Sequence, residues 1–79
     1  MTIDINKLKA AIEFGSDIEF SYNNKKYTIL PWTDEGIVIG LQGTDNDSIY
    51  KTADDLINNH KIDGKNIKDI IKDIEILLI

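Results

Sequence analysis

The segment DIEFSYNNKKYTI, residues 17–29, decides the fold, because it has the pattern of a complete β-hairpin. From Ile18 to Tyr22, apolar and polar side chains alternate, as in a strand with one buried face. Asn23 and Asn24 follow, and asparagine tolerates the positive φ angles of a two-residue turn. This turn sets a register that pairs Ile18 with Ile29, Phe20 with Tyr27, Glu19 with Thr28, and Ser21 with Lys26. Apolar side chains then face apolar ones and polar face polar, so pattern and register agree.

A helix is predicted before the hairpin, over residues 4–14. Its buried face consists of apolar residues at helical spacing: Ile5, Leu8, Ala11 and Ile12. Asp4 or Thr2 can cap the first turn, and Gly15 stands where a left-handed residue commonly ends a helix.

Two further strands are predicted after the hairpin. Continued alternation would turn Leu30 and Trp32 away from the buried face, and Pro31 cannot donate a ladder hydrogen bond, so we expect a bulge or an edge position here. The polar segment TDEG then predicts a turn, IVIGL (37–41) a third strand, and SIYK (48–51) a short fourth strand after a polar loop.

The last third of the chain has two helix-start signals. Thr52 and Asp55 have the spacing of a capping box, which predicts a helix to about Asn59 that buries Leu56 and Ile57. The segment KIDGKN, residues 61–66, breaks this helix. Asn66 can cap the last one, which would begin at Ile67. The sequence therefore predicts one α+β domain over residues 1–79, with an N-terminal helix, a three- to four-stranded antiparallel meander and two C-terminal helices.

The final segment, IKDIIKDIEILLI (67–79), is unusually apolar at its end. A helix would place six residues on one stripe, namely Ile67, Ile70, Ile71, Ile74, Leu77 and Leu78. Ile76 and Ile79 fall outside that stripe. Three interpretations follow: a frayed helix with exposed isoleucines, a strand over residues 74–79 on the sheet edge, or a helix whose second face packs on another chain. The third makes Ile76 and Ile79 candidate partner contacts and predicts a homo-oligomer formed through this tail.

Composition bears on the kind of partner. The net charge is −5, and all nine basic residues are lysine. Because arginine is the usual reader of phosphates and guanine, an acidic chain without it is not expected to bind nucleic acid directly. It suits a protein with a basic face. The further candidate contacts are Trp32 and the carboxylates of Asp45, Asp47, Asp54 and Asp55.

The sequence gives no sign of membrane insertion or export. It has no apolar stretch long enough for a membrane span, and residues 1–14 lack the apolar core of a signal peptide. With no cysteine, disulfides and thiolate metal sites are excluded. These features predict a cytoplasmic protein.

No motif for catalysis, cofactor binding or metal binding is recognised. His60 is the only histidine, and its position at a helix end favours a structural role. A calcium loop starting at Asp45 would need glycine where Tyr50 stands and glutamate where Leu56 stands. The segment around Gly64 and Lys65 lacks the other residues of a phosphate-binding loop. We therefore expect no enzymatic activity, no cofactor and no metal.

Two stretches resemble short proteins from prophages and mobile elements of low-GC Gram-positive bacteria. The first matches their hairpin pattern IEFxYNGKxYxI at Ile18, Glu19, Phe20, Tyr22, Asn23, Lys25, Tyr27 and Ile29. The second matches IxGKx[IL]x[DE]I at Ile62, Gly64, Lys65, Ile67, Asp69 and Ile70. Asn24 departs by replacing a common glycine, and it tolerates the same φ angle. The resemblance implies a small acidic protein that binds and blocks a host protein, including components of antiviral defence.

Three hypotheses on function follow. The first is a non-enzymatic protein that inhibits a host protein in the bacterial cytoplasm, for example an anti-CRISPR or another inhibitor of immunity. The alternative is an oligomeric sponge for a signalling nucleotide, with a pocket built across a dimer from Lys25, Lys26, Lys61 and Lys65. The third is a structural domain with no partner beyond itself.

Overall fold

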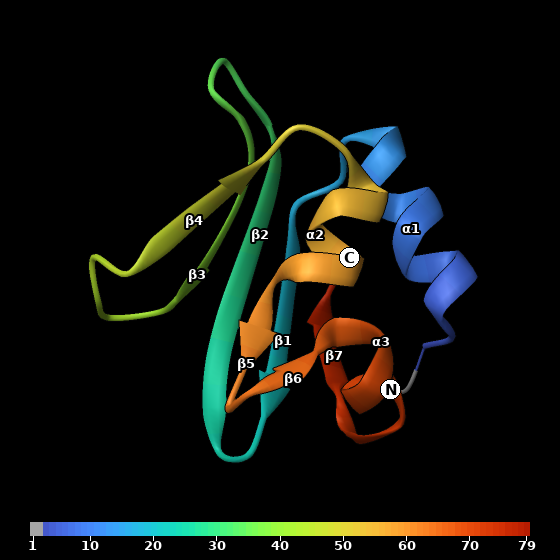
Figure 1. Cartoon of the computed structure of the whole chain (residues 1–79), viewed down its shortest axis with the longest axis vertical. Helices are drawn as coiled ribbons and strands as arrows, with labels where there is room; N and C mark the ends of the chain where they lie inside the picture. The colour runs from blue at the N-terminus through green and yellow to red at the C-terminus, as the bar shows by residue number, and fades with distance from the viewer. Residues whose placement is uncertain (1–2) are drawn as a thin grey trace.

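In the computed structural model, which describes residues 3–79, five antiparallel strands form one sheet, and the helices lie on one of its faces (Figure 1). The elements are α1 (Ile5–Phe14), β1 (Ile18–Tyr22), β2 (Lys25–Thr33), β3 (Gly36–Leu41), β4 (Asp47–Tyr50), α2 (Ala53–Asn59), β5 (Lys61–Ile62), β6 (Lys65–Asn66), α3 (Ile67–Ile70), the 3-10 turn η1 (Ile71–Asp73) and β7 (Glu75–Leu78). The strand order in the sheet is β4-β3-β2-β1-β7. The predicted α+β class is confirmed, while the sheet has one strand more than the meander that was expected.

The β1–β2 hairpin has the predicted register at all four residue pairs. Asn23 and Asn24 have φ angles of 54° and 63°, so both adopt the left-handed conformation that the turn requires. On the buried face, the rings of Phe20 and Tyr27 stack with centroids 5.2 Å apart. The hairpin thus forms the centre of the sheet from local sequence signals.

The predicted irregularity at Pro31 is confirmed as a shift of register between β2 and β3. Leu30 lies opposite Val38, and Thr33 lies opposite Gly36, so β2 has one extra residue between these pairs. A residue inserted in this way bends the strand and changes the direction of the neighbouring side chains. Trp32 lies in this insertion.

The first two helices begin at the predicted residues. The Asp4 carboxylate accepts a hydrogen bond from the Lys7 backbone N–H at 2.9 Å, and Thr52 Oγ1 accepts one from the Asp55 N–H at 3.0 Å. Gly15 ends α1 with a φ of 92°. The alternative cap, Thr2, lies outside the described residues.

The last segment differs from the predicted helix. α3 is only four residues long, and after η1 the chain extends into β7, which pairs antiparallel with β1 at the edge of the sheet. Ile74 and Ile76 point into the core, with 1% and 6% of their surfaces exposed. Of the three interpretations, the edge strand is confirmed and the helical stripe is wrong. Isoleucines spaced by four fit both periods, and pairing with β1 satisfies backbone groups on both strands.

The segment 61–66 is also more ordered than expected. Instead of a simple break it forms the two-stranded hairpin β5–β6, turned by Asp63 and Gly64 at φ angles of 53° and 80°. Asp63 accepts a hydrogen bond from Asn23 Nδ2 at 3.2 Å, so the tips of the two hairpins touch. Asn66 precedes α3, but its side chain makes no capping bond, and its buried Oδ1 has no hydrogen-bond partner among the described residues.

Candidate partner-binding surface

Three exposed apolar side chains surround one depression at an end of the sheet. β1 begins where β2 and β7 end, because it is antiparallel to both. Trp32, Leu78 and Ile79 therefore meet there, and we call these three residues the edge patch. With Gly15, Ser16 and Asp17 they line a shallow depression of about 530 Å³. The exposed fractions are 62%, 48% and 47%, so large apolar side chains lie beside one another in contact with solvent.

The Trp32 ring is held in place by a neighbouring carboxylate. Its indole Nε1–H donates a hydrogen bond to Asp17 Oδ1, in the loop between α1 and β1. A tryptophan whose polar atom already has a partner can present its faces to another molecule without losing a hydrogen bond. The β2 bulge and Asp17 together make Trp32 a fixed aromatic surface.

The structure corrects the predicted roles of the tail residues. Ile76 is in the core, so it cannot contact a partner while the protein is folded. Ile79 is exposed, as a contact residue must be. Leu77 and Leu78, which were expected to be buried in a helix, are instead 46% and 48% exposed. Strand alternation turns Leu77 away from the core side of Ile76. Alternation ends there, because the pairing with β1 shifts register between Ile76 and Leu78, and Leu77 is the extra residue of β7.

Sequence reasoning missed Phe14, which is 88% exposed at the end of α1, directly before the lining residue Gly15. The sequence did hold a signal: Phe14 falls outside the apolar face of the predicted helix, so a large apolar residue was left on the surface. It also missed Asp17, whose contact with Trp32 joins residues 15 positions apart.

The four aspartates proposed as partner contacts do not form one site. Asp47 lies opposite Gly40, near the last residue of β3. Trp32 lies near the other end of β3, where its neighbour Thr33 pairs with Gly36. Asp45 precedes it in the exposed loop. Asp54 lies in the first turn of α2 and pairs with Lys9 of α1 at 3.0 Å.

The Asp55 carboxylate accepts a hydrogen bond from Asn59 Nδ2 at 2.6 Å, within α2. The pair formed by Asp54 and Lys9 thus joins α2 to α1, and the pair formed by Asp55 and Asn59 lies within α2. Asp45 and Asp47 lie at the opposite end of the sheet from the edge patch.

A second, polar depression of about 460 Å³ lies between β5 and the ends of β2, β3 and β4. Lys25 and Lys61 line it, together with the carboxylates of Asp47 and Asp63, so its charges balance. Lys25 is also 4.0 Å from Asp63. The other two lysines proposed for a nucleotide site, Lys26 and Lys65, do not line it.

His60 borders this depression and packs edge-on against Tyr50. Burial lowers the pKa of His60 below its ordinary value of 6.5, and burial raises the pKa of Tyr50. His60 is therefore neutral at pH 7. Its Nδ1 forms a hydrogen bond with the Tyr50 hydroxyl, at 3.0 Å. This pair joins β4 to the end of α2, as expected for a structural histidine.

The lowered pKa of His60 predicts a loss of stability in mild acid. In the unfolded chain, where its pKa is near 6.5, the histidine binds a proton at a higher pH than in the folded protein. The free energy of unfolding should therefore fall as pH drops through about 6.5, until the folded-state pKa is passed. Urea titrations between about pH 7.5 and 5.5, above the range of ordinary carboxylates, measure this slope. His60→Gln should flatten it, and an unchanged slope would show that another group is responsible.

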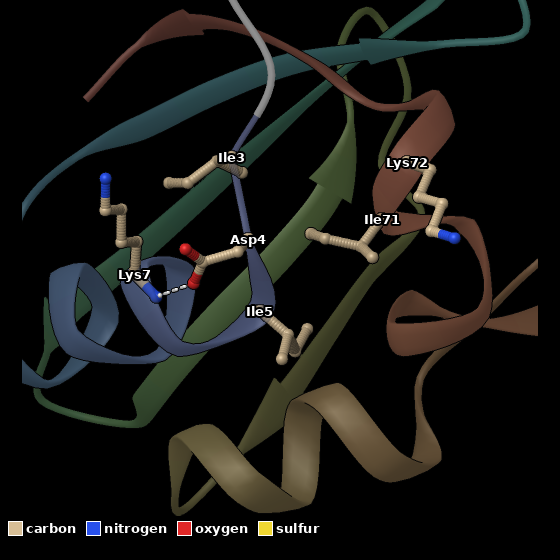
Figure 2. Close-up of a pocket in the computed structure, with 6 residues that line it drawn as sticks. All are labelled: Ile3, Asp4, Ile5, Lys7, Ile71 and Lys72. Carbon is tan, nitrogen blue, oxygen red and sulfur yellow. Dashed lines mark hydrogen bonds between the residues drawn. The ribbon is translucent and has the colours of Figure 1, made fainter.

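A third depression, of about 570 Å³, lies between the start of α1 and η1. Figure 2 shows Ile3 and Ile5 on one side and Ile71 opposite them, with the ammonium groups of Lys7 and Lys72 pointing away from each other. A ligand site needs a few polar groups that converge on the ligand. Here the Asp4 carboxylate is engaged in capping α1, and the lysines diverge.

Neither a metal centre nor a membrane helix is found over residues 3–79. No three acidic, histidine or cysteine side chains come close enough there to hold a metal ion. Within the same range, no helix has the length and apolar character needed to cross a membrane.

No family model, curated protein or solved structure matches the chain. Fold and surface define a small α+β protein with an apolar patch at one end of the sheet.

Proposed function

We propose that the chain is a non-enzymatic interaction protein that binds a partner protein with a basic face through the edge patch. The observation that carries the proposal is the exposure of Trp32, Leu78 and Ile79 around one depression. A few residues, with tryptophan prominent among them, supply most of the binding energy in protein interfaces when they are fully covered in the complex, and the side chains around them exclude water.

The charge of the molecule favours a basic partner. The net charge of −5 attracts positively charged proteins and repels nucleic acids. Near the edge patch, Asp17 lines the depression, and Asp34 and Glu35 follow in the turn after β2. An apolar centre with an acidic surround is complementary to an apolar surface surrounded by lysine or arginine.

The resemblance to proteins of prophages and mobile elements supplies the finer part of the proposal. On that basis, the partner is a host protein of an antiviral defence system, bound in the bacterial cytoplasm. Binding would inhibit it by covering its basic working surface. The alternative, a nucleotide sponge, has less support, because the depression lined by Lys25 and Lys61 carries two carboxylates as well.

Affinity capture with three baits tests the proposal. The baits are the native chain, Leu78→Asp in the edge patch, and Ile49→Asp on the opposite edge strand β4. Leu78 and Ile49 are both 48% exposed, so the second variant is a matched control. Lysates of low-GC Gram-positive bacteria are the source, and mass spectrometry identifies the bound proteins and nucleotides.

We expect one protein with a basic surface to be captured in stoichiometric amount by the native chain and by Ile49→Asp. Leu78→Asp should reduce its capture at least about tenfold, because a carboxylate would be buried in the interface. Equal capture by all three baits would contradict a role for the edge patch. A bound nucleotide without any protein would favour the sponge.

A further inference from the structure

The two edges of the sheet differ in how they are protected against pairing with another strand. Proteins commonly guard exposed edges with charged residues, proline or short strands. At the β4 edge, charged residues Asp47 and Lys51 stand at the first position of the strand and directly after its end. At the other edge, β7 has β1 as its strand neighbour on one side, and no strand lies on its other side in the described part of the chain. Like β4, β7 begins with a charged residue, Glu75, so the two edges differ at the other end of the strand. There the last two residues of β7 and Ile79 are all apolar and exposed.

The depression of the edge patch lies at the apolar end of β7, where Leu78 and Ile79 form part of its lining. A strand added beside β7 would continue the sheet with main-chain hydrogen bonds. Every second side chain of that strand would point to one face, where the walls formed by Leu78 and Ile79 offer apolar contact. The edge therefore provides both components of β-strand addition, which are a backbone template and a side-chain pocket.

The pocket also has the chemistry of a cation site. The exposed indole of Trp32 and the carboxylate of Asp17 are joined by a hydrogen bond, so a ring face and a negative charge lie together. A lysine or arginine side chain is attracted to both. None of the residues lining the depression is basic.

The same charges disfavour a second copy of this chain as the occupant. The sequence contains no arginine, and β7 contains no lysine. Two copies joined through β7 would bring together two acidic surrounds on molecules that each carry a net charge of −5.

We propose that β7 is a docking edge for an extended segment of the partner, which pairs with β7 as a sixth strand and places a lysine or arginine against Trp32 and Asp17. This inference rests on the proposed function and specifies its binding mode. It requires a partner segment in which apolar residues alternate, with a basic residue at the end nearest Trp32.

Two pools of synthetic peptides test the binding mode. Each peptide is roughly eight residues long, as an ordinary strand is, with Val, Ile, Leu or Phe at alternate positions. One pool has lysine and arginine at both ends, and the other has aspartate and glutamate. Fluorescence anisotropy measures affinity, and amide hydrogen exchange followed by NMR locates the contact.

We expect the basic pool to bind about tenfold more tightly than the acidic pool and to slow exchange in β7. Leu78→Asp should abolish this binding, and Ile49→Asp should leave it unchanged. Asp17→Asn keeps an acceptor for the Trp32 N–H and removes the charge, so it should reduce the preference for the basic pool.

Three results would overturn the binding mode: equal affinity for both pools, protection of amides only outside β7, or a native chain that is dimeric in light scattering while Leu78→Asp is monomeric. These failures are distinguishable from failure of the proposed function. If the basic pool does not protect β7 but host-protein capture still depends on Leu78, the function stands and strand addition is wrong. If capture does not depend on Leu78 either, both are wrong.

Discussion

Ile76→Asp is expected to leave most of the protein unfolded. Ile76 lies opposite Phe20 in the pairing of β7 with β1, and only 6% of its surface is exposed. Loss of the isoleucine side chain alone costs about 2–5 kcal/mol, and a buried carboxylate without a partner adds to that cost. The total stability of 79 residues is about 4–12 kcal/mol, so the substitution removes a large part of it.

Leu77→Asp is the matched control, because the neighbouring Leu77 lies in the same strand and is 46% exposed. It should change the free energy of unfolding by less than about 1 kcal/mol. Urea denaturation followed by circular dichroism compares the two variants. A well-folded Ile76→Asp, as the helical interpretation of the tail would require, would show that β7 does not form.

Phe20→Ala has the second-largest expected effect. Phe20 is 1% exposed at the centre of the sheet, where it stacks on Tyr27 and lies opposite Ile76 on the other neighbouring strand. Truncation of a fully buried phenylalanine costs about 3–5 kcal/mol, since apolar contacts are lost and a cavity remains.

The same substitution at Phe14 provides the comparison, because Phe14 is 88% exposed. Phe14→Ala should alter stability by less than about 0.5 kcal/mol. The midpoints of urea denaturation give both values. If the two phenylalanines cost the same, the assignment of β1 as a central strand would be wrong.

The hairpin was predictable because every signal that forms it is local. The turn residues Asn23 and Asn24 fix the register, and the alternation from Ile18 to Tyr22 fixes the buried face. The caps of α1 and α2 were predictable for the same reason, since Asp4 and Thr52 act within three residues. Local chemistry thus specified the first four strands and two helices.

The remaining elements depend on contacts between distant parts of the chain. The spacing of Ile70 and Ile74 fits a helical stripe as well as a strand. The strand forms because its residues pair with the second edge of β1, which lies more than 50 residues earlier in the sequence. The strands β5 and β6 have two residues each, which is too short for any periodic pattern. Asp63 and Gly64 were correctly associated with a break, but the hairpin that they form was not foreseen.

The candidate site was only partly predictable. Trp32 and Ile79 were identified from their chemistry, and both line the depression. Ile76 was misplaced because a helix and a strand expose different positions of the same segment. The contribution of Asp17 could not be derived, because it depends on β1 bringing the α1–β1 loop beside the end of β2.

Site-specific photocrosslinking tests the central claim most directly. A photoreactive amino acid is placed at Ile79 in one version of the protein and at Ile49 in another, both exposed to a similar degree on opposite edges of the sheet. After irradiation in the lysate used for capture, we expect position 79 to give one abundant adduct with a basic host protein and position 49 to give none. An adduct of equal abundance from both positions, or from position 49 alone, would contradict binding through the edge patch.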